Sequence, residues 1–337
     1  MLVFYVSGHG FGHATRTGAI LKEIRKLDAL LPMTIRTAAP DWPFAAASAY
    51  HKMVLEPRIV EDADALGVNL AQSAAKLEQF ETELPDLIAS ETAFLQQNHV
   101  RLIVADIPFV AGLIAAASGI PAWACGNFHW NWIFAGYPVA ERIAQAYSHF
   151  EAALRYPLSH TEGWQVFPRV IDVPLVTPRS GRLRSAIRSQ IGLADDRRSI
   201  VLNGGRAKLD QDALSQLETL GEEFAIIDNT TLTDFHDLVR VCDVVVSKPG
   251  YSIAAECIAE QHPLVYPPRS GFPEDAMLQQ HFQRVATTVE MPVDDWRRGN
   301  WKPFLRLALT SHTPADRLEV NGAEVCARLI YGRYQSA

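Results

Sequence analysis

Hydrophobic residues in this chain form short continuous runs separated by longer amphipathic stretches. Continuous apolar runs of strand length are typical of a parallel sheet that helices cover on both faces. In the first half the pattern predicts, in order, a strand over 2–6, a helix over 14–30, a strand over 33–37, a helical stretch over 69–98, a strand over 101–105, a helix ending at Ser118 and a strand over 121–125. Gly119 suits the C-cap of the helix before it.

The second half repeats this alternation. We predict strands over 199–203, 224–228, 244–247, 263–266 and 287–291, and helices over 210–220, 250–259 and 275–285. Such alternation indicates βαβ units with right-handed crossovers. The predicted class is therefore α/β, with two doubly wound domains. The predicted boundaries are 1–172, 173–314, and a C-terminal helix at 315–337 that packs back on the first domain.

Composition narrows the classes of protein. The 337 residues are 48% hydrophobic and 20% charged, which allows a large core. The net charge of −7 argues against a nucleic-acid partner. No run is long enough to span a membrane, and the N-terminus lacks the basic region of a signal peptide, so we expect a cytoplasmic protein. The four cysteines lie in or beside apolar stretches and are expected to be reduced, with no metal site.

A glycine-rich turn joins the first strand to the first helix. Its members are Gly8, His9, Gly10, Phe11, Gly12 and His13. The glycines allow the backbone to approach a ligand, and His13 at the helix start could act as a base near neutral pH. A histidine in a surface turn is the simpler alternative.

Asp106 follows the strand over 101–105. In a doubly wound sheet, ligands lie beyond the carboxyl ends of the strands. Asp106 could therefore orient His13 and stabilise its imidazolium form. It could equally be the N-cap of the next helix.

A second strand-to-helix junction suits a diphosphate. Lys248 offers a charge, Gly250 a close backbone approach, and Ser252 a hydroxyl at a helix N-terminus. Glu256 lies one turn further on the same face, where it could bind ribose hydroxyls. An ordinary capped helix is the alternative.

Other candidates are supported by composition alone. Gly204, Gly205 and Arg206 form a glycine-rich turn with a cation, or a plain polar loop. Arg269 and Glu274 flank a helix start and could bind sugar hydroxyls, although acidic residues there also favour the helix dipole. Asn127 and Trp130 suit a sugar or a buried domain contact. Asp64 belongs to a D-x-D sequence that does not end a clear strand, so we expect no metal there.

The segment from Tyr5 to Arg16 resembles the opening of a bacterial group of predicted glycosyltransferases and of the N-terminal domain of plant L-arabinokinase. The likeness continues at 62–66, 127–130, 171–176 and 248–251. More distantly, the chain is similar to GT-B enzymes of the MurG and plant UDP-glycosyltransferase kinds. That resemblance implies a GT-B fold of two Rossmann-like domains, with the donor held mainly by the C-terminal domain. It gives the base role to His13, the orienting role to Asp106, and diphosphate contacts to Gly250, Tyr251 and Ser252.

The leading hypothesis is an inverting, metal-independent glycosyltransferase that uses a nucleotide-sugar, expected to be UDP-linked, as substrate and needs no cofactor. The partners are that donor and an acceptor hydroxyl compound. We assign donor binding to Gly204, Gly205, Arg206, Lys248, Gly250, Tyr251, Ser252, Glu256, Arg269 and Glu274. We assign the acceptor side to Gly8, His9, Gly10, Phe11, Gly12, Asp64, Asn127 and Trp130. Two alternatives stay open: a nucleotide-sugar epimerase of the same fold, and a non-catalytic nucleotide-sugar sensor.

Overall fold

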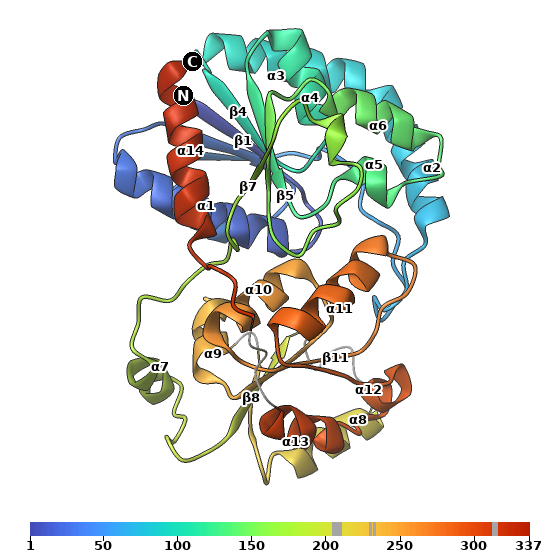
Figure 1. The fold of residues 1–337 in the computed structure, drawn as a ribbon, viewed down its shortest axis with the longest axis vertical. Coiled ribbons are helices and arrows are strands. Elements are labelled where there is room, and N and C mark those ends of the chain that lie inside the picture. The colour runs from blue at the N-terminus through green and yellow to red at the C-terminus, as the bar shows by residue number, and fades with distance from the viewer. Residues whose placement is uncertain (204–210, 229–230, 232–233, 312–315) are drawn as a thin grey trace. The chain divides into compact units, whose positions relative to one another are not determined.

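The computed structural model describes residues 1–203, 211–228, 231, 234–311 and 316–337. The chain divides into two compact units, each a parallel sheet with helices packed against it (Figure 1). The first unit comprises residues 1–60, 69–177 and 319–337, and the second comprises 61–68 and 178–318. The predicted α/β class with two doubly wound parallel sheets is confirmed.

The first unit contains a seven-stranded sheet in the order β3-β2-β1-β4-β5-β6-β7, with all neighbours parallel. Its strands are β1 (Leu2–Val6), β2 (Met33–Thr37), β3 (Ala49–Lys52), β4 (Leu102–Asp106), β5 (Ala122–Gly126), β6 (Ala152–Arg155) and β7 (Val170–Asp172). Its helices are α1 (Gly12–Leu27), α2 (Leu70–Phe80), α3 (Leu84–Gln97), α4 (Val110–Ser118), α5 (Trp130–Ile133), α6 (Val139–Tyr147) and α14 (Gly322–Ser336). Short 3-10 turns lie at Trp42–Phe44, Glu81–Glu83 and Trp164–Val166.

The central strands explain the continuous apolar runs. Every residue of β1, β2, β4 and β5 is buried, as expected for strands covered on both faces. The helical stretch predicted over 69–98 is two helices. Pro85 lies in the first turn of α3, where its missing N–H costs no hydrogen bond, so a new helix begins there. Gly119 caps α4 with a φ of +70°.

The C-terminal helix packs on the first unit, as predicted. Helix α14 runs along α1 (Figure 1). The chain reaches it through a tight crossing in which the Gly322 N–H donates to the Leu175 carbonyl oxygen at 3.1 Å. A Cβ atom on Gly322 would lie 2.1 Å from the Pro174 carbonyl oxygen, so only glycine fits at the start of this helix.

The second unit contains a five-stranded parallel sheet in the order β12-β11-β10-β8-β9. Its strands are β8 (Ser199–Asn203), β9 (Ala225–Asp228), β10 (Val244–Ser247), β11 (Leu264–Tyr266) and β12 (Thr288–Glu290). Its helices are α7 (Arg184–Gln190), α8 (Gln211–Leu220), α9 (Phe235–Val241), α10 (Tyr251–Glu260), α11 (Pro273–Val285), α12 (Val293–Arg298) and α13 (Lys302–Thr310).

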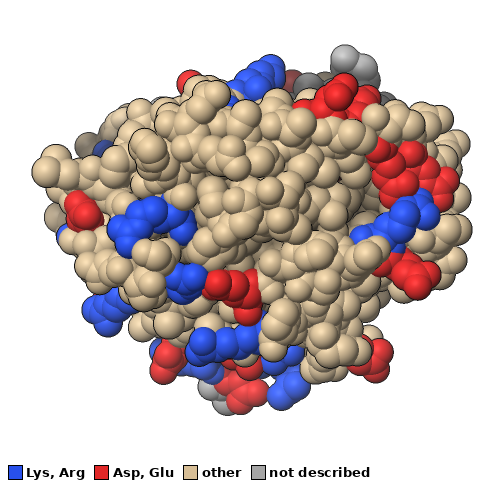
Figure 2. All heavy atoms as spheres, turned by 90° about the horizontal axis from the view of Figure 1, so that it is seen from above, with Lys and Arg blue, Asp and Glu red and all other residues tan. Residues whose placement is uncertain are grey.

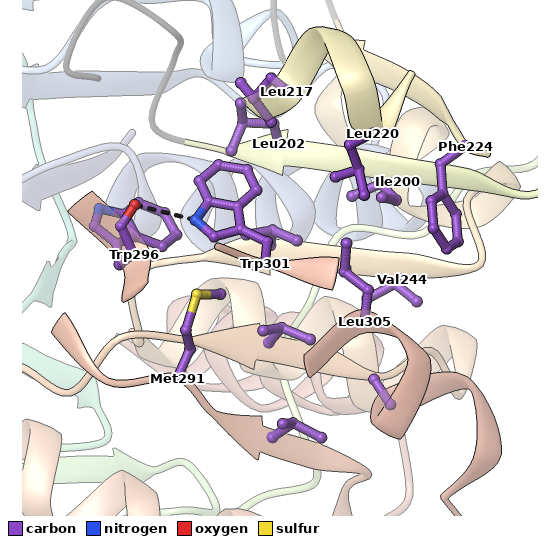
Figure 3. Close-up of a cluster of buried hydrophobic side chains, with 14 of the residues drawn as sticks. Ile200, Leu202, Leu217, Leu220, Phe224, Val244, Met291, Trp296, Trp301 and Leu305 are labelled. Atoms are coloured by element: carbon purple, nitrogen blue, oxygen red, sulfur yellow. Dashed lines mark hydrogen bonds between the residues drawn. The ribbon is translucent and has the colours of Figure 1, made fainter. Parts of the chain in front are cut away.

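The core of the second unit gathers around Trp301, which is almost fully buried (Figure 3). Its indole N–H donates to the Trp296 carbonyl oxygen at 3.0 Å. Leu66 also belongs to this core, although it lies far earlier in the chain. The neighbouring Gly67 forms a parallel β-bridge with Ser270.

Segment 61–68 therefore belongs to the second unit, whereas the predicted boundaries placed it inside the domain 1–172. The chain also leaves the first unit after Thr177, five residues beyond the predicted boundary.

All four cysteines are buried and unpaired. Within the described ranges, no helix is both long and apolar enough to cross a bilayer. On the face shown in Figure 2, Lys and Arg side chains are interspersed with Asp and Glu.

Candidate active site

The loop between β1 and α1 follows a path that needs glycine. The Ser7 N–H donates to the Asp106 carbonyl oxygen at 2.7 Å, which ties the loop to the end of β4. A Cβ atom on Gly8 would lie 2.9 Å from the Cβ of Ala38. Gly10 has a φ of +65°, a left-handed conformation that other residues adopt only with strain. The sequence at these positions is therefore dictated by the backbone.

Two exposed aromatic rings lie near each other here, one from this loop and one from the 3-10 turn Trp42–Phe44. Phe11 is 61% exposed and Trp42 is 41% exposed. Their ring centroids are 6.2 Å apart. Because Phe11 directly precedes α1, this apolar surface adjoins the first turn of that helix.

The sheet brings His13 and Asp106 together. Strands β1 and β4 are parallel neighbours, with Val6 paired to Asp106, so the helix that follows β1 starts beside the end of β4. His13 Nδ1 lies 2.8 Å from Asp106 Oδ1, although the two residues are 93 positions apart. Both side chains are buried. The two residues predicted as base and orienting carboxylate are therefore in direct contact.

Asp106 has two further partners that sequence reasoning missed. Arg16 binds the carboxylate in a bidentate manner, because its Nε donates to Oδ2 at 2.7 Å and its Nη2 donates to Oδ1 at 2.5 Å. Thr17 Oγ1 donates to Oδ2 at 3.2 Å. Burial alone would raise the pKa of Asp106, but the charge and hydrogen bonds of Arg16 and His13 outweigh it and hold the pKa below its usual value. Asp106 is thus an ionised acceptor at neutral pH.

Arg16 is itself held in place. Its Nη1 donates to the Asn127 side-chain oxygen at 2.8 Å, and its guanidinium carbon lies 5.1 Å from the centre of the Tyr156 ring. Asn127, predicted on the acceptor side, is fully buried and contacts Arg16. The one available signal for Arg16 was its position three residues after His13, which places the two on one helix face.

A second carboxyl group contacts the same loop and was also missed. Ser7 Oγ donates to Glu56 Oε1 at 2.5 Å, and His9 Nε2 lies 3.6 Å from that oxygen. Burial raises the pKa of Glu56 to about 7, although the Ser7 hydrogen bond opposes the shift. Burial, with the charges of His13 and Arg58, lowers the pKa of His9 to about 3. His9 is therefore neutral, and Glu56 is close to half protonated at pH 7.

Aromatic side chains from the segment after β5 surround both histidines. The Trp130 ring lies edge-on to His9 at 4.9 Å, and Phe128 lies edge-on to His13 at 5.9 Å. Trp130 is almost fully buried, so in this structure it packs beneath the loop. These rings exclude water from the imidazoles and restrict how they turn.

In the second unit, the predicted diphosphate junction begins α10. Gly250 is the N-cap in extended conformation, and a Cβ atom there would meet nothing within 4 Å. Tyr251 is buried and Ser252 half-buried. Glu256 is buried, and burial together with Glu260 raises its pKa to about 8. Its Oε2 is buried and has no hydrogen-bond partner among the described residues.

Charged residues also gather after β10 and β11. Asp275, at the start of α11, is buried, and burial raises its pKa to about 7 while the charges of Arg269 and Lys248 oppose the shift. Arg269 Nη1 lies 3.5 Å from Asp275 Oδ1. Glu274 is buried in the same turn. The predicted donor residues Lys248, Arg269 and Glu274 thus lie in one region, with Asp275 as an additional member.

Segment 61–68 borders this region. Arg269 Nη2 lies 2.8 Å from Glu61 Oε1, and its Nε donates to the Ala65 carbonyl oxygen at 3.1 Å. Asp64, predicted on the acceptor side, belongs to the second unit and pairs with Arg297 at 2.5 Å.

Gly204, Gly205 and Arg206 lie outside the described residues. Among the residues that the structure does describe, no three His, Cys, Asp or Glu side chains gather as a metal site would require.

Comparison with known proteins gives one curated relative. L-arabinokinase of Arabidopsis thaliana is 28% identical over an alignment of 362 residues, gaps included. The alignment covers 98% of this chain. The chain spans about a third of that protein, 34% of its length. No family model matches the sequence.

Solved structures match over nearly the whole chain. Acinetobacter baumannii MurG aligns with a TM-score of 0.55 and 14% identity, covering 98% of this chain and 99% of MurG. Glycosyltransferase VinC, solved with dTDP, gives 0.58 and 14%, covering 99% and 95%. Spinosyn rhamnosyltransferase SpnG, solved with spinosyn aglycone, gives 0.60 and 11%, covering 99% and 96%. The chain therefore has the GT-B glycosyltransferase fold.

Proposed function

We propose that this chain catalyses inverting, metal-independent transfer of a sugar from a nucleotide-sugar to an acceptor hydroxyl. The observation that carries the proposal is the 2.8 Å contact between His13 Nδ1 and the ionised Asp106. A hydrogen on Nδ1 directed at this carboxylate leaves the lone pair on Nε2 to act as a base. The GT-B fold is consistent with this chemistry.

The step is a single displacement. Nε2 of His13 takes the proton of the acceptor hydroxyl while that oxygen bonds to the anomeric carbon of the donor. The bond from the anomeric carbon to the diphosphate oxygen breaks on the opposite face, so the configuration inverts. Asp106 stabilises the imidazolium that forms. A general base of this kind contributes about 10²–10⁴-fold to the rate.

The second unit would hold the donor, with UDP as the expected nucleotide. The ten-residue helix α10 directs its N-terminal dipole at the diphosphate, and Lys248 adds a charge. Glu256 would receive the ribose hydroxyls. Asp64, in the D-x-D sequence, pairs with Arg297. This pairing supports a mechanism in which Lys248 and the α10 dipole stabilise the diphosphate in place of a metal ion.

The test begins with a thermal-shift screen of UDP-, GDP- and dTDP-sugars, because a ligand stabilises the native state by mass action. With the donor known, His13→Ala should lower turnover by at least about 100-fold while the donor affinity is unchanged. The exposed His149 provides a matched control, and His149→Ala should retain full turnover.

Near-normal turnover in His13→Ala would contradict the base assignment. Loss of activity on chelation, restored by Mg²⁺, would contradict metal independence. Isomerised donor formed without acceptor would assign an epimerase instead. Donor binding with no product from any acceptor would assign a sensor.

A further inference from the structure

His13 Nδ1 has two neighbours that require opposite protonation states of this nitrogen. Asp106 Oδ1 lies 2.8 Å away and Arg16 Nη2 lies 2.9 Å away. An ionised carboxylate only accepts hydrogen bonds, and a guanidinium only donates them. A nitrogen of a neutral imidazole carries either a hydrogen or a lone pair, so Nδ1 can serve only one of the two neighbours.

The choice decides what the opposite nitrogen can do. If Nδ1 donates to Asp106, the lone pair is on Nε2, which can accept a proton. If Nδ1 accepts from Arg16, Nε2 carries the hydrogen and cannot act as a base.

We propose that Arg16 is a positioning residue that holds Asp106 as an ionised acceptor and thereby keeps His13 in the Nδ1–H form. The inference rests on the proposed function, because it explains how the base is kept competent. Arg16 Nη2 is 2.5 Å from Asp106 Oδ1, closer than to His13 Nδ1, and Arg16 Nε is 2.7 Å from Oδ2. The Arg16 and His13 donors converge on the same oxygen, which accounts for their 2.9 Å separation.

The surroundings keep Arg16 in this orientation. Arg16 is almost fully buried. Asn127 accepts a hydrogen bond of 2.8 Å from Nη1, and the Tyr156 ring lies against the guanidinium. A planar side chain fixed at Nε, Nη1 and Nη2 cannot turn toward His13 without breaking its contacts with Asp106.

Removal of the Arg16 charge should reverse the arrangement. Burial then dominates at Asp106, and its pKa rises, because burial is the largest influence on this carboxyl. A protonated carboxyl would donate its hydrogen to His13 Nδ1, and the hydrogen of the neutral imidazole would then be on Nε2 instead of Nδ1. The base would be lost although His13 and Asp106 are both present.

Nitrogen NMR of the substrate-free protein labelled with ¹⁵N-histidine tests this, because hydrogen-bearing and bare ring nitrogens have well-separated shifts. A His13→Gln sample assigns the signals. We expect bare Nε2 in the wild type and hydrogen-bearing Nε2 in Arg16→Gln at the same pH. Thr17→Val is the matched control, since it removes a 3.2 Å hydrogen bond to Asp106 but no charge, and should match the wild type.

Hydrogen-bearing Nε2 in the wild type, or bare Nε2 in Arg16→Gln, would overturn the inference. If Arg16→Gln does not fold, Arg16→Lys replaces it. The lysine ammonium cannot bind the carboxylate in a bidentate manner, so it stabilises the ionised form of Asp106 less than arginine does. The ¹³C NMR signal of the Asp106 carboxyl should therefore titrate at higher pH in Arg16→Lys than in the wild type. An unchanged titration would overturn the inference. No substrate is used, so absence of sugar transfer would contradict the proposed function and leave this result intact.

Discussion

The hydroxyl of Ser7 donates a 2.5 Å hydrogen bond to the buried carboxyl of Glu56, which ties the residue after β1 to the segment that follows β3. The His9 backbone N–H donates in turn to Ser7 Oγ at 3.3 Å, and the Ile59 N–H donates to His9 Nδ1 at 3.4 Å. These contacts fix the residues on both sides of Gly8 to the segment that contains Glu56 and Ile59. The glycine-rich loop therefore depends on a carboxyl group whose protonation changes near neutral pH.

Glu56→Gln should change how stability depends on pH. Burial raises the pKa of Glu56 from 4.5 to about 7, so the folded state binds this proton more tightly than the unfolded state does. The wild type should therefore lose about 3 kcal/mol of unfolding free energy as the pH rises from 4.5 to about 7, and little more above that. The variant cannot ionise and should lack this loss.

Urea denaturation across this pH range measures the difference between the two proteins. Glu141→Gln, at an exposed position on α6, is the control and should follow the wild type. Parallel pH profiles of Glu56→Gln and the wild type would contradict the raised pKa, because they would show that Glu56 has the same pKa in the folded and unfolded states.

Lys248→Met should weaken nucleotide binding. A hydrogen bond to a charged group contributes about 1.5–3 kcal/mol, so the Kd for UDP should rise by about tenfold to a hundredfold or more. Isothermal titration calorimetry with UDP measures this. Lys302→Met is the control, because Lys302 is exposed in the same unit and pairs with Glu223 at 2.7 Å. Equal affinities in the two variants would remove Lys248 from the donor site.

Gly10→Ala should destabilise the protein, because an alanine at a φ of +65° adopts the left-handed conformation at a cost of about 1–2 kcal/mol. The same substitution at Gly332 should act in the opposite direction. Gly332 lies exposed in α14, and a Cβ atom there would meet nothing within 4 Å. Alanine in a helix interior is favoured by about 0.5–1 kcal/mol. Chemical denaturation measures the unfolding free energy of both variants. A stabilised Gly10→Ala would mean that the loop has a different path.

Leu66→Ala should destabilise the second unit and leave the first unchanged. Leu66 is buried in the core around Trp301, and such a truncation costs about 2–5 kcal/mol. Hydrogen–deuterium exchange should become faster in peptides from 178–318. Leu307→Ala, at a position that is 55% exposed in the same unit, is the control. Faster exchange confined to the first unit would contradict the assignment of segment 61–68 to the second.

The sequence determined the elements and the local chemistry of this protein. Strands β2, β8 and β10 have the predicted bounds, because a continuous apolar run reports the burial of consecutive residues on both faces of a sheet. The C-cap at Gly119 follows from the same local rules. His13 was found at the helix start after the first strand and Asp106 at the end of the strand over 101–105, on the side where doubly wound sheets bind ligands.

Tertiary structure decided which of these residues meet. The pairing of β1 with β4 brings His13 to Asp106, and the same helix face adds Arg16, whose spacing from His13 alone did not distinguish it from a solvated arginine. Likewise, the sequence around Glu56 indicates only a polar residue in a loop. In the structure Glu56 is buried and accepts a hydrogen bond from Ser7. Apolar periodicity reports burial along a single element. The partner of a buried charge depends on strand order, which brings together residues almost a hundred positions apart and is not encoded in any local stretch.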